Sequence, residues 1–528
     1  MLLKSRLVFF LIHITLCSCK TFLFISIPFI GHITPLIRQA IELDHRHHVD
    51  TKIYIISCSN VRDYVQRSSS NTTIEFLDIG FCHNDTKFIE DMQILSSQSS
   101  FPYTISMLYQ SIIEHYYPRM YEQMLSTLDN EIFRSDPLTI AVIDYVTYAG
   151  ADIADHFDIP YIVNVASVLP YIGWHVTSPF DSNPAILLES PQSIHSIGTN
   201  LFFRLMFPIL RSIYLVHMYF RYDRAFNTLR TTKYHLNTSV HIWSRFDSHL
   251  ILVNNAFGLE YPQDLPGNVQ LIAPLLNIKH RSNDYVSELS EEDQTWIDTD
   301  SRPIIYINFG TLISLTIEQI QKIYLALQSL DQYRIIWKLN HPELPSTDDF
   351  RIVPWISSSL GYLAHSNVHL FISHCGINSV YESIWLGTSI LCIPIFADQQ
   401  DMAQRVEDAG VGRWLHKFTF TSQQLKQTII NMFEEKQRSA REKNLQRIQA
   451  WMKLHGGIER TVDLIETVAE HGVELLVPIN RSYPWYAYYN FDVYVLWLLV
   501  LILLRQCMRH CCYRRRHSST NQSKTKIS

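Results

Sequence analysis

The clearest pattern of apolar and polar positions lies between residues 367 and 399. Two apolar runs, 368–372 and 390–396, have the length of buried strands. Between them, apolar side chains recur at helical spacing at Ile377, Val380, Tyr381, Ile384 and Trp385. Gly387 follows, and glycine commonly occupies the position after the last helical turn. The pattern predicts a βαβ unit.

The same alternation occurs in both halves of the chain. Strand-length apolar runs cover residues 22–27, 52–57, 140–143, 304–309 and 333–339. A helical pattern that includes Leu36, Ile37 and Ala40 follows the first run, and capping boxes open helices at Thr316 and Thr421. This order predicts an α/β fold with parallel sheets and helices on both faces.

The turn at residues 373–376, Ser-His-Cys-Gly, joins a predicted strand to a predicted helix. Free backbone N–H groups and the positive end of the helix dipole suit a phosphate there. Gly376 lets a phosphate approach the main chain, and His374 can donate to it. Asn378 and Glu382 are four residues apart and share one flank of the helix.

This segment resembles the signature of the UDP-glycosyltransferases, a family that attaches sugars to small lipophilic acceptors. The resemblance implies that the histidine, the small residues after it and the helix start hold the diphosphate. It also implies that the glutamate binds the ribose and that a final Asp-Gln pair binds the sugar. Carried over by position, these roles fall on His374, Gly376, Asn378, Ser379, Glu382, Asp398 and Gln399.

The first strand leads into a second part of the resemblance. Pro28, Gly31, His32 and Pro35 match the start of the family's first domain, which implies that His32 is the general base and places Gly31 beside the UDP-sugar. Asp144, at the carboxyl end of the run 140–143, matches the acidic partner of that histidine. An imidazole titrates close to working pH, and a carboxylate can fix its tautomer.

Other donor contacts follow from the same resemblance. Thr311 matches a residue that touches the diphosphate, and Trp355 matches the aromatic residue that stacks on uracil. The chain departs from the family pattern at residues 357–358, at 388–389 and at Met402. These departures put the base contact and the sugar contact in question more than the phosphate site.

Composition narrows the function classes. The 528 residues are 47% hydrophobic and 18% charged, which allows two to four globular domains. A net charge of −6 and the lack of a basic, aromatic face argue against nucleic acid as a partner. The nine cysteines do not form a disulfide-scaffold pattern or a zinc spacing, and Asp298 and Asp300 are more typical of a solvated edge than of a metal site. We expect no metal and no cofactor besides the UDP-sugar co-substrate.

Both ends of the chain have targeting features. Lys4 and Arg6 precede an apolar stretch, as in a signal peptide, and sequons occur at Asn71, Asn84, Asn237 and Asn480. The apolar run 493–504 is shorter than the ~20 residues of a membrane span. The aromatic residues before it supply the missing length, and five arginines follow it. A buried core helix is the weaker interpretation. The ending Lys524-Thr-Lys526-Ile-Ser resembles a signal for return to the endoplasmic reticulum.

The resemblance covers most of residues 21–505 and implies two facing Rossmann-like domains, the GT-B arrangement, followed by a C-terminal transmembrane helix. We expect a type I protein of the endoplasmic reticulum membrane with lumenal catalytic domains. The aromatic segments 100–124 and 167–222 would line the acceptor pocket, with an amphipathic helix at 201–219. The predicted parts are a signal peptide (1–19), an acceptor domain (20–275), a linker (276–302), a UDP-sugar domain (303–472), a juxtamembrane segment (473–488), a transmembrane helix (489–506) and a basic cytosolic tail (507–528).

The expected reaction is transfer of a hexosyl group, glucuronic acid or glucose, from a UDP-sugar to a hydroxyl of a small lipophilic acceptor. It would proceed with inversion and without a metal. Two alternatives stay open: a membrane-tethered UDP-sugar-binding protein without turnover, and a transferase that acts on a lipid or sterol. A dinucleotide dehydrogenase is disfavoured because no G-x-G-x-x-G follows a strand. The donor sugar, the acceptor and a homo-oligomeric state are undetermined.

Overall fold

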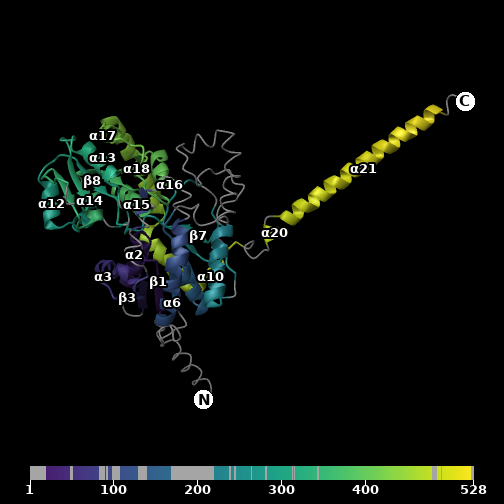
Figure 1. Cartoon of the computed structure of the whole chain (residues 1–528), viewed down its shortest axis with the longest axis horizontal. Coiled ribbons are helices and arrows are strands. Elements are labelled where there is room, and N and C mark those ends of the chain that lie inside the picture. The colour runs from purple at the N-terminus through teal and green to yellow at the C-terminus, as the bar shows by residue number, and fades with distance from the viewer. Residues whose placement is uncertain are drawn as a thin grey trace, which may run out of the picture. The chain divides into compact units, whose positions relative to one another are not determined.

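A computed structural model shows two parallel β-sheets, each with helices on both faces (Figure 1). The structure describes residues 20–47, 51–82, 90, 93–94, 96–97, 107–128, 139–167, 219–236, 239–242, 245–262, 265–279, 282–311, 313, 315–341, 344–478, 485–488 and 490–524. The predicted signal peptide and the sequons at Asn84, Asn237 and Asn480 lie outside these residues, as does nearly all of the predicted helix 201–219.

The first sheet has seven strands in the order β3-β2-β1-β4-β5-β6-β7. The second has six strands in the order β10-β9-β8-β11-β12-β13. The strands of the first sheet are β1 (Lys20–Ile25), β2 (Thr51–Ser57), β3 (Glu75–Asp78), β4 (Thr139–Asp144), β5 (Tyr161–Val165), β6 (Ile251–Val253) and β7 (Val269–Leu271). Those of the second are β8 (Ile304–Asn308), β9 (Arg334–Lys338), β10 (Phe350–Val353), β11 (Val368–Ser373), β12 (Ser389–Cys392) and β13 (Gly412–Trp414).

The strand order reverses between β1 and β4 in the first sheet and between β8 and β11 in the second. Open α/β sheets bind ligands at such switch points, outside the carboxyl ends of the strands. The predicted fold of two Rossmann-like domains is therefore confirmed.

Helices connect the strands and cover the sheets. In the first domain they are α2 (Ile30–Arg46), η1 (Ser59–Val61), α3 (Arg62–Ser68), η2 (Ile112–Tyr116), α6 (Tyr117–Leu128), α7 (Tyr148–His156), η4 (Tyr219–Asp223) and α10 (Arg224–Tyr234). Next come α11 (Ser282–Val286) and α12 (Glu291–Asp298), which lie within the predicted linker. The second domain contains α13 (Ile317–Leu327), α14 (Ser359–Ala364), α15 (Ile377–Leu386), α16 (Gln399–Asp408), α17 (Ser422–Phe433) and α18 (Glu435–Leu454), and α19 (Gly457–His471) follows.

Most local signals have the predicted effect. Gly387 ends α15 with φ at 86°, and both capping boxes, at Thr316 and Thr421, are formed. Two boundaries were wrong. β12 ends at Cys392 instead of residue 396, because Pro394 has no N–H for the sheet. The helix after β1 begins at Ile30, before Leu36 of the predicted helical pattern, and contains Pro35, so His32 lies in its first turn.

The end of the second half returns to the first domain. α19 packs against α2, and its Ile458, Val462 and Ile465 are buried in the cluster that contains Phe22 and Phe24 of β1. The last helix of the predicted UDP-sugar domain (303–472) therefore packs on the first domain.

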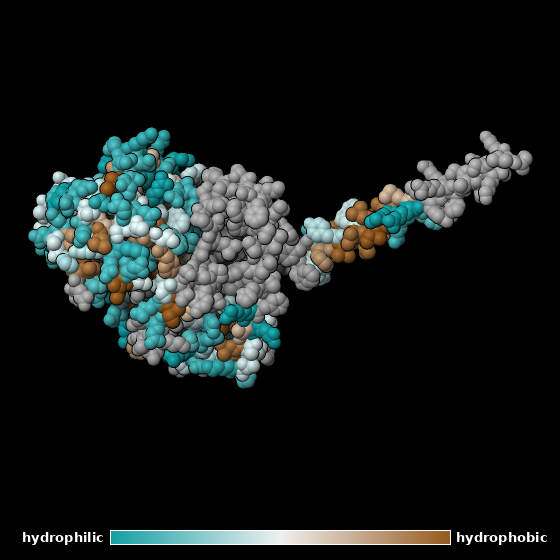
Figure 2. All heavy atoms as spheres, turned by 45° about the horizontal axis from the view of Figure 1, so that its top comes forward, coloured by the Kyte–Doolittle hydropathy of each residue, from teal (hydrophilic) through white to brown (hydrophobic). Residues whose placement is uncertain are grey.

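The chain divides into two compact units between Leu476 and Val477. The second unit contains α20 (Trp485–Tyr488) and α21 (Phe491–Lys524), a continuous helix of 34 residues. Residues 491–510 of α21 are long and apolar enough to cross a membrane, with a mean hydropathy of 1.9. Figure 2 shows these apolar side chains as a brown band on the helix. The apolar C-terminal helix was predicted, and its length and composition suggest a membrane anchor.

Candidate active site

His32 and Asp144 meet at the switch point of the first sheet. β1 and β4 are neighbours, so the first turn of α2 lies beside Asp144, the last residue of β4. The two side chains are 2.8 Å apart, from Nδ1 of His32 to Oδ1 of Asp144. An ionised carboxylate only accepts hydrogen bonds, so Nδ1 carries the proton and Nε2 is free to act as a base.

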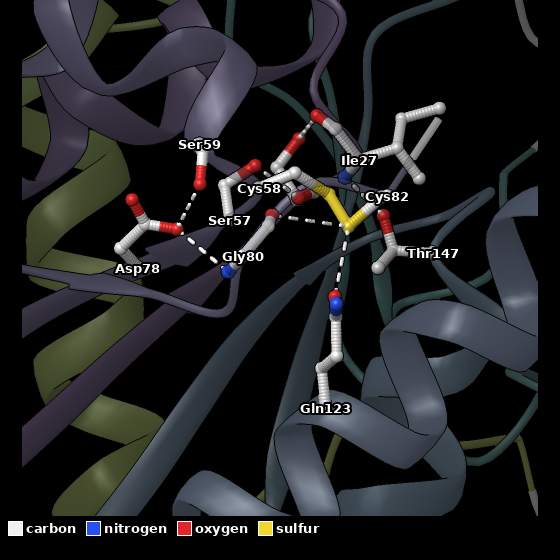
Figure 3. Close-up of a disulfide and its surroundings, with 10 residues drawn as sticks. Ile27, Ser57, Cys58, Ser59, Asp78, Gly80, Cys82, Gln123 and Thr147 are labelled. Atoms are coloured by element: carbon white, nitrogen blue, oxygen red, sulfur yellow. Dashed lines mark hydrogen bonds between the residues drawn. A yellow bond between two sulfur atoms is a disulfide. The ribbon is translucent and has the colours of Figure 1, made fainter. Parts of the chain in front are cut away.

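Thr147 holds the other oxygen of Asp144. Its hydroxyl donates to Oδ2 of Asp144 at 3.0 Å and accepts from the backbone N–H of Ile27 at 2.8 Å. Figure 3 shows this contact between Ile27 and Thr147. The buried carboxylate is therefore fixed by the loop that follows β1 as well as by His32.

The electrostatic surroundings of His32 favour its charged form. Burial lowers the pKa of His32, but the charge and hydrogen bond of Asp144, together with the charge of Asp398, raise it above its ordinary value. The ring of Tyr145 stacks on the imidazole with centroids 5.9 Å apart. The dyad of the first domain is thus coupled to a predicted sugar-binding residue of the second.

His374 lies at the switch point of the second sheet, in the turn after β11. A Cβ atom on Gly376 would come within 2.6 Å of its Nε2, and one on Gly310 within 3.1 Å of its Cε1. Both glycines therefore make room for the imidazole. Desolvation lowers the pKa of His374 to about 4 despite an opposing hydrogen bond to the backbone of Asn308, so the ring is neutral near pH 7.

The start of α15 has the features expected of an anion site. Its N-cap is Gly376, which makes no side-chain capping bond, so the N–H groups of the first turn are available to a ligand. Ser379 lies in that turn, partly exposed, and Thr311 is exposed just after β8, the neighbour of β11. The structure therefore brings the predicted diphosphate residues to one end of the second sheet.

Two predicted donor residues are bonded to the first domain. Nδ2 of Asn378 donates to the carbonyl oxygen of Gly31 at 2.9 Å. Oε1 of Glu382, one turn further along α15, accepts from Nη2 of Arg38 at 2.7 Å. The first contact joins Gly31 to α15, which carries the predicted donor residues and is called the donor helix below. The second contact involves an arginine that no motif had indicated.

The two predicted sugar-binding residues have different surroundings. Asp398 accepts a hydrogen bond of 2.8 Å from Ser167 of the first domain, and desolvation raises its pKa. The side-chain oxygen of Gln399, Oε1, accepts from the backbone N–H groups of Ile395 and Phe396 at 2.9 and 3.1 Å. A sugar contact by Gln399 therefore falls to its amide nitrogen.

Trp355 is the predicted base-stacking residue, and it is 56% exposed. Two cations lie near its ring, Nζ of Lys338 at 4.6 Å and Cζ of Arg67 at 5.5 Å from the ring centroid. The atypical residues that follow have structural partners. Ser357 bonds to Asp293, and Ser358 caps α14 by accepting from the N–H of Gly361 at 3.0 Å.

The two acids of the Asp-x-Asp pattern contact basic side chains. Asp298 lies 3.2 Å from His365, and Asp300 lies 2.5 Å from Arg302. Within the described part of the chain, no three His, Cys, Asp or Glu side chains form a group that could hold a metal ion.

Two disulfides were not predicted, although four cysteines in the body of the chain were a signal for them. Cys375 pairs with Cys392, which links the turn after His374 to the end of β12. Cys58 pairs with Cys82 in the first domain (Figure 3). Thr147, Ser167 and Arg38 were also missed, because they belong to no short motif.

Comparisons with known proteins identify the family of this chain. A family model described as UDP-glucoronosyl and UDP-glucosyl transferase matches residues 63–526. UDP-glycosyltransferase 1 of Phaeomoniella chlamydospora is 29% identical over 288 residues, which span 49% of this chain and 58% of that protein. Human UDP-glucuronosyltransferase 1A3 is 24% identical over 383 residues, 71% of this chain and 68% of that protein.

Solved structures share the fold. The structure of Medicago truncatula UGT71G1 complexed with UDP-glucose has a TM-score of 0.56 and 19% identity, and the match covers 85% of this chain and 99% of that one. The calicheamicin glycosyltransferase CalG4 matches with a TM-score of 0.55 and 14% identity over 86% of this chain and 98% of that one. Because the family model matches far more than half of the chain, the protein belongs to the UDP-glucoronosyl and UDP-glucosyl transferase family.

Proposed function

We propose that the protein transfers a hexosyl group from a UDP-sugar to a hydroxyl of a small lipophilic acceptor, with inversion at the anomeric carbon. One observation carries this proposal. The His32–Asp144 pair of the first domain is under the influence of Asp398, a residue of the second domain at the predicted sugar end of the donor site. This proximity supports a general base that faces the donor site.

His32 acts on the acceptor. Its Nε2 takes the proton of the acceptor hydroxyl as the new bond to the anomeric carbon forms. Asp144 keeps the proton of the free imidazole on Nδ1 and stabilises the imidazolium that results. General-base assistance of this kind contributes about 10²–10⁴ in rate.

Residues of the second sheet act on the leaving group. Negative charge develops on the departing UDP, and the neutral imidazole of His374, the first N–H groups of α15 and the hydroxyl of Thr311 can receive it. Trp355 would stack on the base, and Glu382 would bind the ribose. Attack from the face opposite UDP inverts the anomeric centre, and no step requires a metal.

The donor sugar is glucose or glucuronic acid in this proposal, and a lipid or sterol acceptor is compatible with it. The apolar helix α21 would anchor the protein in the endoplasmic reticulum membrane with both catalytic domains in the lumen. The hydropathy of α21 and the arginines from Arg505 onward support that orientation.

The test measures UDP release by the full-length protein in membranes, with UDP-glucose or UDP-glucuronic acid and a panel of phenols, steroids and ceramide. We expect acceptor-dependent release that falls at least 10²-fold in His32→Ala. His45→Ala, an exposed histidine at the other end of α2, should retain activity. Tight UDP binding without turnover for every pair would contradict the proposal and support a binding protein.

A further inference from the structure

Arg38 of α2 crosses from the first domain to the donor site of the second. Its Nη2 lies 2.7 Å from Oε1 of Glu382, and its Nη1 donates to the carbonyl oxygen of Leu275 at 3.4 Å. The side chains of Arg38 and Glu382 are 24% and 11% exposed, so this ion pair is largely shielded from water. We infer that Arg38 is a positioning residue for the UDP-sugar, an inference that rests on the proposed function.

Arg38 leaves half of the Glu382 carboxylate open. The guanidinium contacts Oε1, and among the described residues no donor is bonded to Oε2. A ribose hydroxyl can therefore bind Oε2 while Arg38 holds Oε1 and restricts the rotation of the carboxylate. The ion pair does not have to break when the nucleotide binds.

The same ion pair also offsets the negative charge of Glu382, which is unfavourable near a diphosphate. A UDP-sugar carries a negatively charged diphosphate, and the ionised Glu382 lies one helical turn from the predicted diphosphate residues. Like charges at such short range repel, and the repulsion is larger in a shielded site than in water. Arg38 offsets the charge of Glu382, so its removal should weaken donor binding.

A second contact holds the same two helices together. Pro35 has no N–H, so the carbonyl oxygen of Gly31 lacks its usual partner within α2 and accepts from Asn378 instead. Gly31 and Arg38 are two turns apart on α2, and Asn378 and Glu382 are one turn apart on α15. α2 thus carries the base His32 and also contacts the donor helix at two points.

The test uses the full-length protein and compares UDP affinity by calorimetry with the kinetics of the active UDP-sugar. Arg38→Met should raise the Kd of UDP and the KM of the UDP-sugar about tenfold or more, with a smaller change in kcat, because the charge of Glu382 then repels the diphosphate and its carboxylate is no longer held in place for the ribose. Arg38→Lys keeps the charge and should recover part of the affinity. The buried pair of Glu260 and Arg405, 2.8 Å apart, also joins the two domains, so these variants should fold.

Arg46→Met is the matched control. Arg46 lies on the same helix and pairs with Asp463 and Glu466 of α19, away from the donor helix. This variant should lower the Tm and leave the Kd of UDP unchanged. Unchanged or tighter UDP binding by Arg38→Met would overturn the inference. Failure of the unmodified protein to bind UDP would instead contradict the proposed function.

Discussion

Thr147 donates a hydrogen bond of 3.0 Å to Asp144, and the same hydroxyl oxygen accepts the N–H of Ile27 at 2.8 Å. Asp144 is also bonded to His32, the proposed general base. The hydroxyl of Thr147 therefore links the His32–Asp144 pair to the backbone just after β1.

Replacement of this hydroxyl tests its role in catalysis. We expect Thr147→Val to lower kcat about tenfold or more, because a hydrogen bond to a charged group is lost and the dyad is less well oriented. The KM of the UDP-sugar should change little. Thr147→Ser retains a hydroxyl and should keep most of kcat. Equal kcat values for the valine variant and the unmodified protein would contradict this role.

The pH dependence of activity should reflect the charges around His32. Burial lowers the pKa of this imidazole, but Asp144 and Asp398 raise it above its ordinary value. A general base works in its neutral form, so kcat/KM for the acceptor should rise with pH as His32 loses its proton. The midpoint of this rise, the acid limb of the profile, should lie above about pH 6.5. Asp398→Asn removes one raising charge and should move this limb to lower pH.

The measurement is a pH–rate profile of each variant, in which the position of the limb is read separately from the rate. The rate of Asp398→Asn should fall as well, since Asp398 is predicted to contact the sugar. Asp401→Asn, on the same helix α16, is the control and should leave the limb in place. A shift of the Asp398→Asn limb to higher pH would refute the coupling.

The two disulfides allow a controlled test of the turn that contains His374, because only one of them lies next to it. Cys375 and Cys392 are 17 residues apart and hold the segment beside His374, whereas Cys58 and Cys82 are 24 residues apart in the first domain. Each disulfide contributes about 2–4 kcal/mol to stability. Both double Cys→Ser variants should therefore have a lower Tm under non-reducing conditions.

Only one of the two variants should change UDP binding. Cys375→Ser with Cys392→Ser frees the turn that is proposed to hold the diphosphate, so its Kd for UDP should rise several-fold. Cys58→Ser with Cys82→Ser should bind UDP as the unmodified protein does. The Kd values are measured by calorimetry at a temperature well below both Tm values. Equal affinities for the two variants would show that the Cys375–Cys392 disulfide has no role in the donor site.

Trp355 offers a test of the base contact. Stacking of a base on an aromatic ring contributes about 1–3 kcal/mol, so Trp355→Ala should weaken UDP binding about 5- to 150-fold. Trp355→Phe keeps a ring and should lose less. Trp451→Ala is the control, because Trp451 is 57% exposed, close to the 56% of Trp355, but lies on α18. Equal Kd values for the two alanine variants would exclude Trp355 from the site.

Local sequence signals were enough to predict much of this fold. The apolar period places α15 between β11 and β12, and Gly387 and the two capping boxes mark helix ends, because each depends on residues within a few positions of one another. The pairing of His32 with Asp144 could be expected because both follow strands at one edge of a sheet, although the resemblance was needed to select them.

Contacts between distant segments could not be predicted in this way. Arg38 and Glu382 are 344 positions apart, and Ser167 and Asp398 are 231 positions apart. Each pair forms only because two domains come together, and no periodicity or motif encodes that approach. The start of α2 was missed for a local reason. The predicted helical pattern began at Leu36, after Pro35, but a helix accepts proline where the unpaired carbonyl oxygen finds another donor, here Asn378.

The position of α19 affects how the protein can fold during synthesis. Ile458, Val462 and Ile465 complete the apolar cluster around β1, so the first domain is built from the beginning of the chain and from a helix more than 400 positions later. Domains usually fold in the order of their synthesis. Here the second sheet can be complete while the first domain still exposes the surface that α19 covers. The nascent chain therefore carries an unfinished first domain until residue 471 emerges, and a truncation after α18 would leave that domain permanently open to chaperones and proteases.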